Sequence, residues 1–264
     1  MRHEYRGVTA LVTGASKGLG RALTLDLARR GARPVLLARS ESGLRELAAE
    51  IGGGEVITAD LATPDGPRRV LAELRARDLT VDLLVNNAGA GSAGPFLDRP
   101  LEPQLRSLHL NVAGLVELTH AIGRDLVARG TGGIVNVSST AGFQPLPYQA
   151  TYAGTKAFVL SFTEALAEEL RGTGVHVMAA HPGAIATGFF DGTTASINPR
   201  FADSPESVAR RLLDDYARRR TASYPGRGLT RAITWVPRLL PRAAVAKAAG
   251  AMNRGLRLHE VVDV

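Results

Sequence analysis

The sequence of 264 residues contains no cysteine, no long apolar run and very little lysine. Without cysteine, neither a disulfide nor a thiolate metal site can form. Because no 18 consecutive residues are apolar, no segment is predicted to span a membrane. The first apolar run soon ends at Gly14, which is typical of a buried strand and not of a secretory signal. We therefore expect a cytoplasmic protein.

Acidic side chains are scarce in the last quarter of the chain. Residues 1–204 hold 20 basic and 20 acidic side chains, whereas residues 205–264 hold 12 basic and 5 acidic ones. The basic segment contains no zinc-finger, homeodomain or basic-zipper pattern, so we expect no nucleic-acid partner. A contact with an anionic ligand, with another subunit or with a membrane surface fits this charge better.

Lysine is the rarer cation, with 3 residues against 29 arginines. One of them, Lys156, follows Tyr152 by four positions in a segment with a helical pattern, so both side chains lie on one face. A tyrosine hydroxyl has a pKa of about 10. A neighbouring ammonium favours the phenolate and would lower that pKa. The pair therefore predicts an acid–base function, which the compact head of a lysine serves better than the planar group of an arginine.

Short continuous apolar runs alternate with helical patterns over the first 181 residues. Continuous runs are typical of parallel strands that are buried on both faces of a sheet. They lie at 8–14, 33–38, 55–60, 81–87, 133–139 and 175–181. The alternation predicts an α/β fold with a doubly wound parallel sheet. We expect one domain over residues 1–264, divided into a core at about 7–190, a covering loop at about 188–204 and a basic helical C-terminal segment at about 226–262.

The first predicted strand is followed by the glycine-rich segment TGASKGLG at 13–20. In an open α/β sheet, the pyrophosphate of a dinucleotide rests on the helix N-terminus that follows such a loop. Gly14, Gly18 and Gly20 would permit the tight turn and the close approach of the backbone. The spacing is G-x-x-x-G-x-G, and a glycine-rich turn without a ligand stays open as the alternative.

The end of the second predicted strand carries Arg39 instead of the acidic residue that binds the ribose 2′-hydroxyl of NAD. Arg39 would pair with a 2′-phosphate, and Lys17 in the glycine loop would add a second positive charge. We therefore expect NADP(H) as the cofactor, with NAD(H) less favoured. The alternative is that Arg39 is solvated and binds nothing.

Six segments together resemble the short-chain dehydrogenase/reductase family. They follow one another in the family's order over about residues 7–190, as TGASKGLG (13–20), NNAG (86–89), Asn111 in LNVAG, VSS (137–139), YAGTK (152–156) and HPGAIAT (181–187). The resemblance implies a Rossmann-type three-layer α/β/α fold, a nicotinamide cofactor and hydride transfer to or from a carbonyl carbon. It also implies a homodimer or homotetramer built through the helices at 101–129 and 150–171.

The resemblance also implies the catalytic roles. Tyr152 would exchange a proton with the substrate, Ser139 would hydrogen-bond the substrate oxygen, and Lys156 would support Tyr152 and bind the cofactor ribose. Asn111 would hold a water that links Lys156 to solvent. A satisfied polar residue in a helix bend is the alternative for Asn111. We interpret His181 as structural, because Tyr152 already fills the role of the acid–base group.

The family pattern further implies which residues contact the cofactor. Asp60 would bind the adenine edge, and Thr187 would hold the nicotinamide carboxamide. The full expected set is Gly14, Ser16, Lys17, Gly18, Leu19, Gly20, Arg39, Asp60, Leu61, Asn87, Ala88, Gly89, Tyr152, Lys156, Pro182, Gly183, Ile185 and Thr187. No metal site is expected, because the histidines lie far apart in the sequence.

A small-molecule substrate would enter beyond the carboxyl ends of the strands, where ligands bind in such sheets. The aromatic side chains near this edge favour a mainly apolar substrate, although they would serve equally well to anchor the covering loop to the core. The expected substrate contacts are Phe143, Tyr148, Phe189 and Phe190.

These features predict an enzyme that uses NADPH to reduce the carbonyl group of a small molecule, with Tyr152 as proton donor. Two alternatives stay open: NADP-dependent oxidation of an alcohol, and a non-catalytic nucleotide-binding scaffold that acts through its basic C-terminal segment. We expect that segment to pack on protein in preference to a membrane surface, because Pro237 and Pro241 interrupt any long interfacial helix.

Overall fold

A computed structural model describes residues 4–188, 194 and 202–262 of the chain. Within these residues, seven strands form one parallel sheet in the order β3-β2-β1-β4-β5-β6-β7. The strands are β1 (Thr9–Thr13), β2 (Arg33–Ala38), β3 (Glu55–Thr58), β4 (Leu83–Asn86), β5 (Gly133–Val137), β6 (His176–Ala180) and β7 (Ala222–Ser223). The predicted parallel sheet is confirmed, and the six predicted strands are the first six of the seven.

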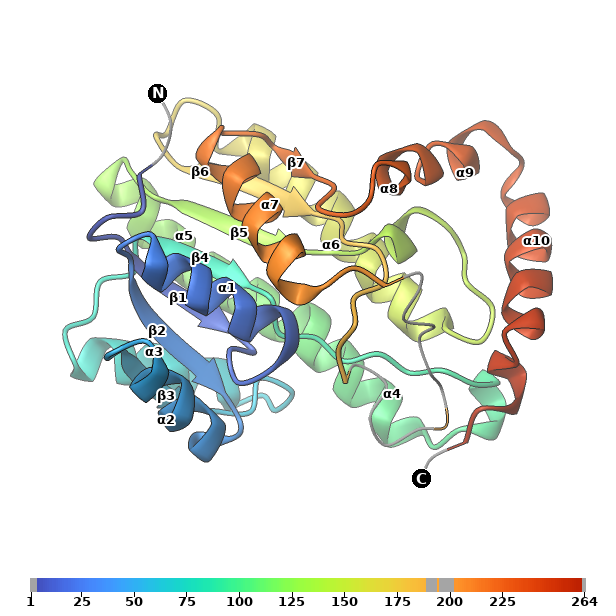
Figure 1. The fold of residues 1–264 in the computed structure, drawn as a ribbon, viewed down its shortest axis with the longest axis horizontal. Helices are drawn as coiled ribbons and strands as arrows, with labels where there is room; N and C mark the ends of the chain where they lie inside the picture. Colours follow the sequence, from blue (N-terminus) through green and yellow to red (C-terminus); the bar gives the residue numbers. More distant parts are fainter. Residues whose placement is uncertain (1–3, 189–193, 195–201, 263–264) are drawn as a thin grey trace.

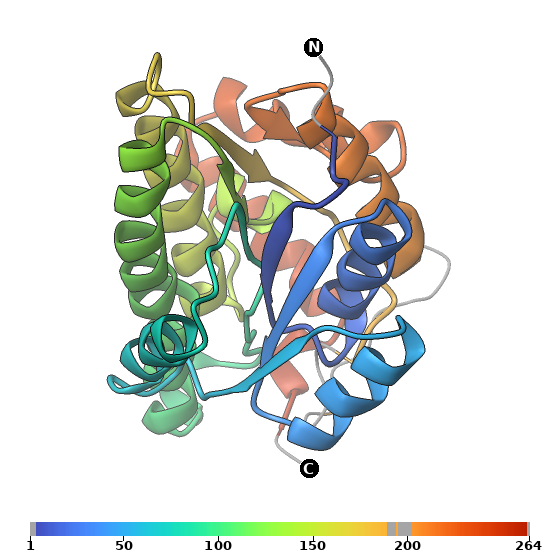
Figure 2. The same ribbon diagram turned by 90° about the vertical axis from the view of Figure 1, so that its left-hand side faces the viewer.

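Helices cover both faces of this sheet, which gives the predicted three layers (Figure 2). One face is covered by α1 (Gly18–Arg29), α2 (Glu41–Glu50) and α7 (Pro205–Ala217), and the other by α3 (Gly66–Ala76), α5 (Gly114–Arg129) and α6 (Ala150–Glu169). Successive side chains of a strand point to opposite faces. Val12 of β1 therefore packs with Leu23 of α1, whereas Leu11 packs with Leu118 of α5.

The carboxyl ends of the parallel strands meet at one edge of the sheet, which is where ligands bind in such folds. The residues just beyond these ends are the glycine loop after β1, Arg39 after β2, Asp60 after β3, Asn87 after β4, Ser139 after β5 and Pro182 after β6. The fold thus gathers predicted site residues from distant parts of the sequence.

The C-terminal segment forms α8 (Leu229–Ile233), α9 (Val236–Leu239), α10 (Arg242–Gly255) and the 3₁₀ turn η5 (Leu258–Glu260). Pro237 lies in the first turn of α9 and Pro241 precedes α10, so the prolines divide the helical pattern. Figure 1 shows α10 across the end of the molecule toward which the strands run. Within the described residues, no helix combines the length and the apolar character needed to cross a bilayer.

Candidate active site

Ser139 and Tyr152 meet at the carboxyl end of β5. Ser139 caps the 3₁₀ turn η3 (Thr140–Phe143), because its Oγ accepts a hydrogen bond from the backbone N–H of Ala141 at 3.1 Å. Tyr152 lies in the first turn of α6, and its side chain hydrogen-bonds the side chain of Ser139. Ser138 instead donates to the backbone oxygen of Lys156 at 2.7 Å, so it fixes α6 to the end of β5. Ser139 is therefore the serine that lies beside Tyr152.

Lys156 lies one helical turn after Tyr152 and is buried. Its Nζ lies 5.8 Å from the centroid of the Tyr152 ring and donates a hydrogen bond to the backbone oxygen of Val137 at 2.9 Å. Burial lowers the pKa of Lys156 to about 8. A Cβ atom built on Gly89 would lie 3.4 Å from this Nζ and 3.4 Å from Oδ1 of Asn111. Lys156 and Asn111 thus face the same small space, which Gly89 leaves open.

The pKa of Tyr152 is raised, not lowered. Burial of the phenol raises this pKa, and the hydrogen bond with Ser139 lowers it by less. The expectation that Lys156 brings the pKa of Tyr152 below its usual value is therefore wrong for this structure, because desolvation of the phenolate dominates. A phenol with a raised pKa is protonated near neutral pH, which suits a proton donor.

Asn111 lies in a π-helical turn, η2 (His109–Ala113), between α4 (Leu101–Leu108) and α5. Its Nδ2 donates to the backbone oxygen of Ala90 at 2.8 Å and to Oγ1 of Thr155 at 3.0 Å. Its Oδ1 accepts from the N–H of Ala90 at 2.9 Å. The side chain is thus satisfied within the protein, as the structural interpretation expects. Single π turns are nevertheless frequent at functional sites.

The glycine loop folds tightly onto the start of α1. Gly14 and Gly18 have left-handed backbone conformations, with φ of 69° and 56°. A Cβ atom on Gly20 would lie 2.1 Å from the backbone oxygen of Gly14, so only glycine fits at position 20. Lys17 precedes the helix and, within the described residues, gives no side-chain cap to its first N–H groups. An uncapped helix N-terminus behind a glycine cradle fits a dinucleotide pyrophosphate.

Asn87 and Ala88 join the end of β4 to the end of β1. Their N–H groups donate to Oγ1 of Thr13 at 3.0 and 2.9 Å, and Nδ2 of Asn87 donates to the backbone oxygen of Thr13 at 2.9 Å. The same Nδ2 would lie 3.1 Å from a Cβ atom on Gly14. Asn87 therefore fixes the start of the glycine loop, at Thr13 and Gly14, to the end of β4. The sequence did not predict this role.

The loop after β6 reaches the glycine loop. Ile185 pairs with Asp203 in an isolated parallel bridge, which fixes the loop that begins at Pro182–Gly183. A Cβ atom on Gly18 would lie 3.1 Å from Cγ2 of Thr187. Thr187 thus lies against the glycine loop, although the strand that precedes it, β6, is three strands away from β1 in the sheet. Two other predicted cofactor contacts, Ser16 and Leu19, lie within the glycine loop. Ser16 is partly exposed and Leu19 is buried.

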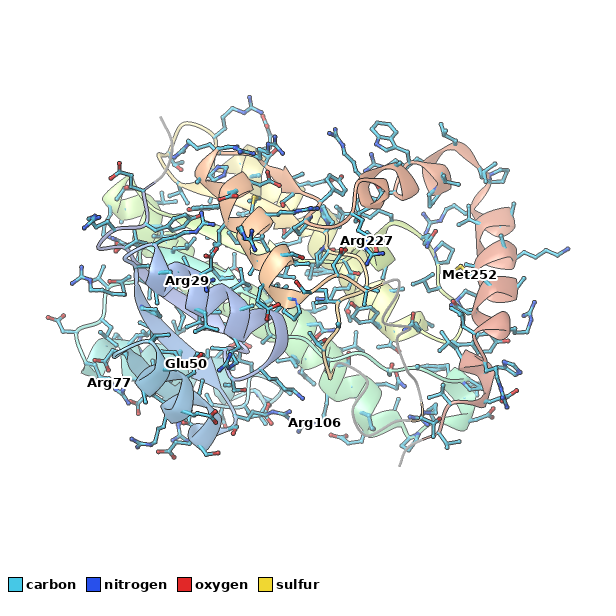
Figure 3. The ribbon with its side chains drawn as sticks, in the orientation of Figure 1. Arg29, Glu50, Arg77, Arg106, Arg227 and Met252 are labelled. Carbon is cyan, nitrogen blue, oxygen red and sulfur yellow. The ribbon has the colours of Figure 1, made fainter. Side chains whose placement is uncertain are left out.

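Asp60 binds protein groups with both carboxylate oxygens. Oδ1 accepts from the N–H of Ala62 at 3.0 Å, and Oδ2 pairs with Arg106 of α4 at 2.6 Å. Figure 3 labels Arg106 among the side chains. Burial would raise the pKa of Asp60, but these hydrogen bonds and the charges of Arg106 and Arg39 lower it. No local pattern indicated a role for Arg106, which lies 46 positions from its partner. The neighbouring Leu61 is buried in the core.

Phe143 is only 9% exposed, which leaves little of its ring for a substrate. It packs edge-on against His181, with ring centroids 5.0 Å apart, and Arg238 of α9 lies 5.2 Å from its centroid. Neither ring nitrogen of His181 has a hydrogen-bond partner within the described residues, and burial together with the charge of Arg238 lowers its pKa to about 4. A neutral, packed His181 fits a structural role. Phe189 and Phe190 lie outside the described residues.

Tyr148 connects the predicted substrate side to the C-terminal segment. Its hydroxyl lies 3.4 Å from Nη1 of Arg254 in α10, and its ring lies 6.0 Å from the ring of His259. The preceding Pro147 accepts a hydrogen bond from Nδ2 of Asn253 at 2.8 Å. Helix α10 and η5 therefore form a wall beside the substrate-side loops. The sequence did not assign this wall, because no local pattern relates residues 106 positions apart.

The short chain dehydrogenase family model matches residues 8–197. A short chain dehydrogenase of Pseudocercospora fijiensis is 37% identical over 188 residues, which cover 69% of this chain and 61% of that protein. The probable oxidoreductase EphD of Mycobacterium tuberculosis is 34% identical over 263 residues, with 90% of this chain and 44% of EphD covered. A very-long-chain 3-oxoacyl-CoA reductase of Laccaria bicolor is 35% identical over 244 residues, with 89% and 71% covered. The chain thus spans less than two thirds of the first two relatives.

Solved structures agree with these relatives. A short-chain dehydrogenase from Sphingobium yanoikuyae in complex with NADPH has a TM-score of 0.79 and 32% identity, with 88% of this chain and 93% of that chain covered. A short chain dehydrogenase/reductase from Burkholderia phymatum in complex with NAD has a TM-score of 0.76 and 25% identity, with 88% and 93% covered. The chain therefore belongs to the short-chain dehydrogenase/reductase family, whose members are NAD(P)-dependent oxidoreductases.

Proposed function

We propose that this protein reduces the carbonyl group of a mainly apolar small molecule to an alcohol, with NADPH as the hydride source. The observation that carries the proposal is the hydrogen bond between Ser139 and Tyr152 beside the buried Lys156. These three groups lie at the same sheet edge as the glycine loop. This is the arrangement that hydride transfer to a carbonyl needs: two hydroxyl donors for the oxygen, a proton source and a nearby cation.

The chain's own groups account for the proton and the oxygen. The hydroxyls of Ser139 and Tyr152 would donate hydrogen bonds to the carbonyl oxygen and stabilise its developing negative charge. A nicotinamide, when bound, would supply the hydride for the carbonyl carbon. Tyr152 then gives its proton to the alkoxide, and the Lys156 ammonium stabilises the phenolate that remains. Lys156 and Asn111 both face the space at Gly89, so a proton would return to Tyr152 by way of Lys156 and a water held beside Asn111.

The protonation state of Tyr152 is compatible with the reductive direction. Burial raises the pKa of the phenol, so the group is held in the acid form that reduction consumes. Alcohol oxidation starts from the phenolate, so its rate would rise with pH. A non-catalytic scaffold gives no reason to place Ser139, Tyr152 and Lys156 together at a sheet edge.

The preference for NADPH rests on Arg39. Arg39 is exposed at the end of β2 and has no hydrogen bond or ion pair within the part of the chain that the structure describes. Its charge acts on Asp60, which places it beside the predicted adenosine site. Lys17 is also exposed in the glycine loop. Arg39 and Lys17 provide two cations, and no acidic residue stands at the end of β2. This combination favours a 2′-phosphate over a free 2′-hydroxyl.

The substrate class rests on the walls of the site and on the relatives. Tyr148 is partly exposed on the loop that follows β5 and packs against Ala93, Leu258 and Val261, so this wall of the site is apolar. The Laccaria bicolor relative is named for the reduction of a very-long-chain 3-oxoacyl group. We therefore propose a ketone on an apolar chain or ring system as the substrate.

The test follows NADPH absorbance with a panel of 3-oxoacyl thioesters, steroid ketones and polar ketoses. We expect turnover of the apolar ketones and a loss of about a thousandfold or more in kcat for Tyr152→Phe, because the proton donor is removed. The dissociation constant for NADPH should stay close to that of the wild type. Equal turnover by Tyr152→Phe, or no turnover of any carbonyl by a wild type that binds NADPH, would refute the proposal.

A further inference from the structure

The C-terminal quarter presents an apolar surface to solvent. Trp235, Val236, Leu239 and Leu240, on and beside α9, are 50%, 56%, 79% and 50% exposed. Val245 of the same segment is buried against the rest of the chain, whereas these four side chains are not. Three exposed arginines flank them: Arg231, Arg238 and Arg242. We call these seven residues the α9 surface.

The stretch of sequence that carries the α9 surface has charged side chains of one sign. Residues 216–259 contain ten basic side chains and no acidic one. In residues 1–204, by contrast, acidic and basic side chains balance. Exposed aliphatic groups, a tryptophan and arginines on short helices are the composition of segments that lie in the plane of a bilayer surface. We propose that the α9 surface docks this protein on an anionic lipid bilayer.

A second copy of the chain is the competing occupant. Two copies joined through the α9 surface would bring together two segments without acidic side chains, and like charges across an interface are unfavourable. Anionic headgroups attract the same arginines. In addition, a separate stripe of exposed leucines on α4, far from α9 in Figure 1, is available for contacts between copies: Leu101, Leu105 and Leu108. Charge complementarity therefore favours the lipid surface.

The α9 surface is connected to the substrate side of the candidate site. The guanidinium carbon of Arg238 lies 5.2 Å from the ring centroid of Trp235 and 5.2 Å from that of Phe143. Phe143 ends η3, four residues after Ser139. A bilayer in contact with Trp235 would therefore lie beside the site, so that an apolar ketone reaches Ser139 and Tyr152 from the lipid. This consequence rests on the proposed function, whereas the docking itself does not.

Trp235 is the only tryptophan of the chain, so its fluorescence reports on the α9 surface alone. The experiment titrates the full chain with vesicles of phosphatidylcholine, with or without phosphatidylglycerol, and compares the tryptophan emission with co-sedimentation. We expect a blue shift and co-sedimentation with the anionic vesicles only, and a weaker effect as the salt concentration rises. An unchanged emission with anionic vesicles at low salt would overturn the proposal.

Two substitutions test the surface itself. Leu239→Glu adds a carboxylate to the α9 surface and should lower partitioning onto anionic vesicles by about tenfold or more. Leu97→Glu is the control, at a position that is 90% exposed in the 3₁₀ turn η1 (Phe96–Asp98). It changes the net charge by the same amount and should bind anionic vesicles as the wild type does. In the double variant Arg231→Gln, Arg242→Gln, partitioning onto anionic vesicles should fall by about fivefold for each charge removed.

The remaining readouts separate the competing explanations. Equal binding of Leu239→Glu and the wild type would overturn the proposal. So would a change from dimer to monomer caused by Leu239→Glu in analytical ultracentrifugation, because it would assign the surface to a second copy. Turnover of a water-soluble ketone is measured in parallel and should be unaffected by Leu239→Glu. If Leu239→Glu loses vesicle binding but keeps this turnover, docking is supported. If neither the wild type nor Leu239→Glu turns over a ketone, only the proposed function is refuted.

Discussion

Asn253 of α10 donates a hydrogen bond from Nδ2 to the backbone oxygen of Pro147 at 2.8 Å, and this bond joins the C-terminal segment to the loop before α6. The loop continues through Tyr148, whose φ of 68° is strained for a side chain of this size, into Tyr152. Gly250 lets α10 approach closely, since a Cβ atom there would lie 3.3 Å from Cγ of Pro147. Helix α10 thus holds a strained loop next to the candidate proton donor.

Asn253→Ala should loosen this loop without touching the chemistry. A neutral hydrogen bond contributes about 1 kcal/mol, which corresponds to about fivefold in an equilibrium. We therefore expect KM for the ketone to rise by about fivefold, while kcat and the dissociation constant for NADPH stay within about twofold. Steady-state kinetics and an NADPH titration measure these constants. Lys247→Ala, at an exposed position of the same helix, is the control and should match the wild type. An unchanged KM in Asn253→Ala would contradict this role.

The buried charge of Lys156 should lower the stability of the folded protein. Its pKa falls from 10.5 to about 8 on folding, because burial disfavours the ammonium. Below pH 8 both the folded and the unfolded chain are protonated, and the buried charge costs about 3 kcal/mol. Between pH 8 and 10.5 the folded state loses the proton first. The unfolded chain then holds more protons, so this group makes the protein more stable as the pH rises.

Lys156→Met should therefore separate stability from activity. At pH 7 we expect a melting temperature equal to or above that of the wild type, with kcat lower by about a hundredfold or more. The advantage in melting temperature should shrink between pH 8 and 10.5. Thermal unfolding monitored by circular dichroism at several pH values measures it. Lys247→Met removes an exposed ammonium and should leave the stability unchanged. A large loss of stability in Lys156→Met at pH 7 would show that the ammonium stabilises the fold.

The parts of the fold that the sequence predicted are those encoded by local patterns. Continuous apolar runs identify strands buried on both faces, and the steric demands at Gly14 and Gly20 identify the loop after β1. The ion pair between Asp60 and Arg106 and the wall formed by α10 depend on contacts between distant segments, for which no local pattern exists. The pKa of Tyr152 was predicted in the wrong direction, because spacing along a helix reveals a neighbouring charge but not the degree of burial.

Arg39→Asp should reverse the cofactor preference. Arg39 is the exposed cation at the end of β2, and a charge-assisted bond to a 2′-phosphate contributes about 1.5–3 kcal/mol. We expect kcat/KM for NADPH relative to NADH to fall by about a hundredfold, since the new carboxylate repels a phosphate and accepts from a 2′-hydroxyl. Arg45→Asp, on the exposed face of α2, makes the same charge change away from the strand end and should keep the preference. A ratio that is equal in Arg39→Asp and the wild type would mean that Arg39 is merely solvated.

The leucine stripe of α4 should form the contact between two copies of the chain. Leu101, Leu105 and Leu108 are 60%, 41% and 42% exposed and lie on one helical face, and Phe158 of α6 is 40% exposed. We expect a dimer in analytical ultracentrifugation, and a monomer for Leu105→Glu, because an interface would bury the new carboxylate without a partner. Leu239→Glu makes the same substitution on the α9 surface and should remain a dimer. Dissociation by Leu239→Glu but not by Leu105→Glu would reverse the two assignments, with the copies joined through α9 and the leucines of α4 left to another partner.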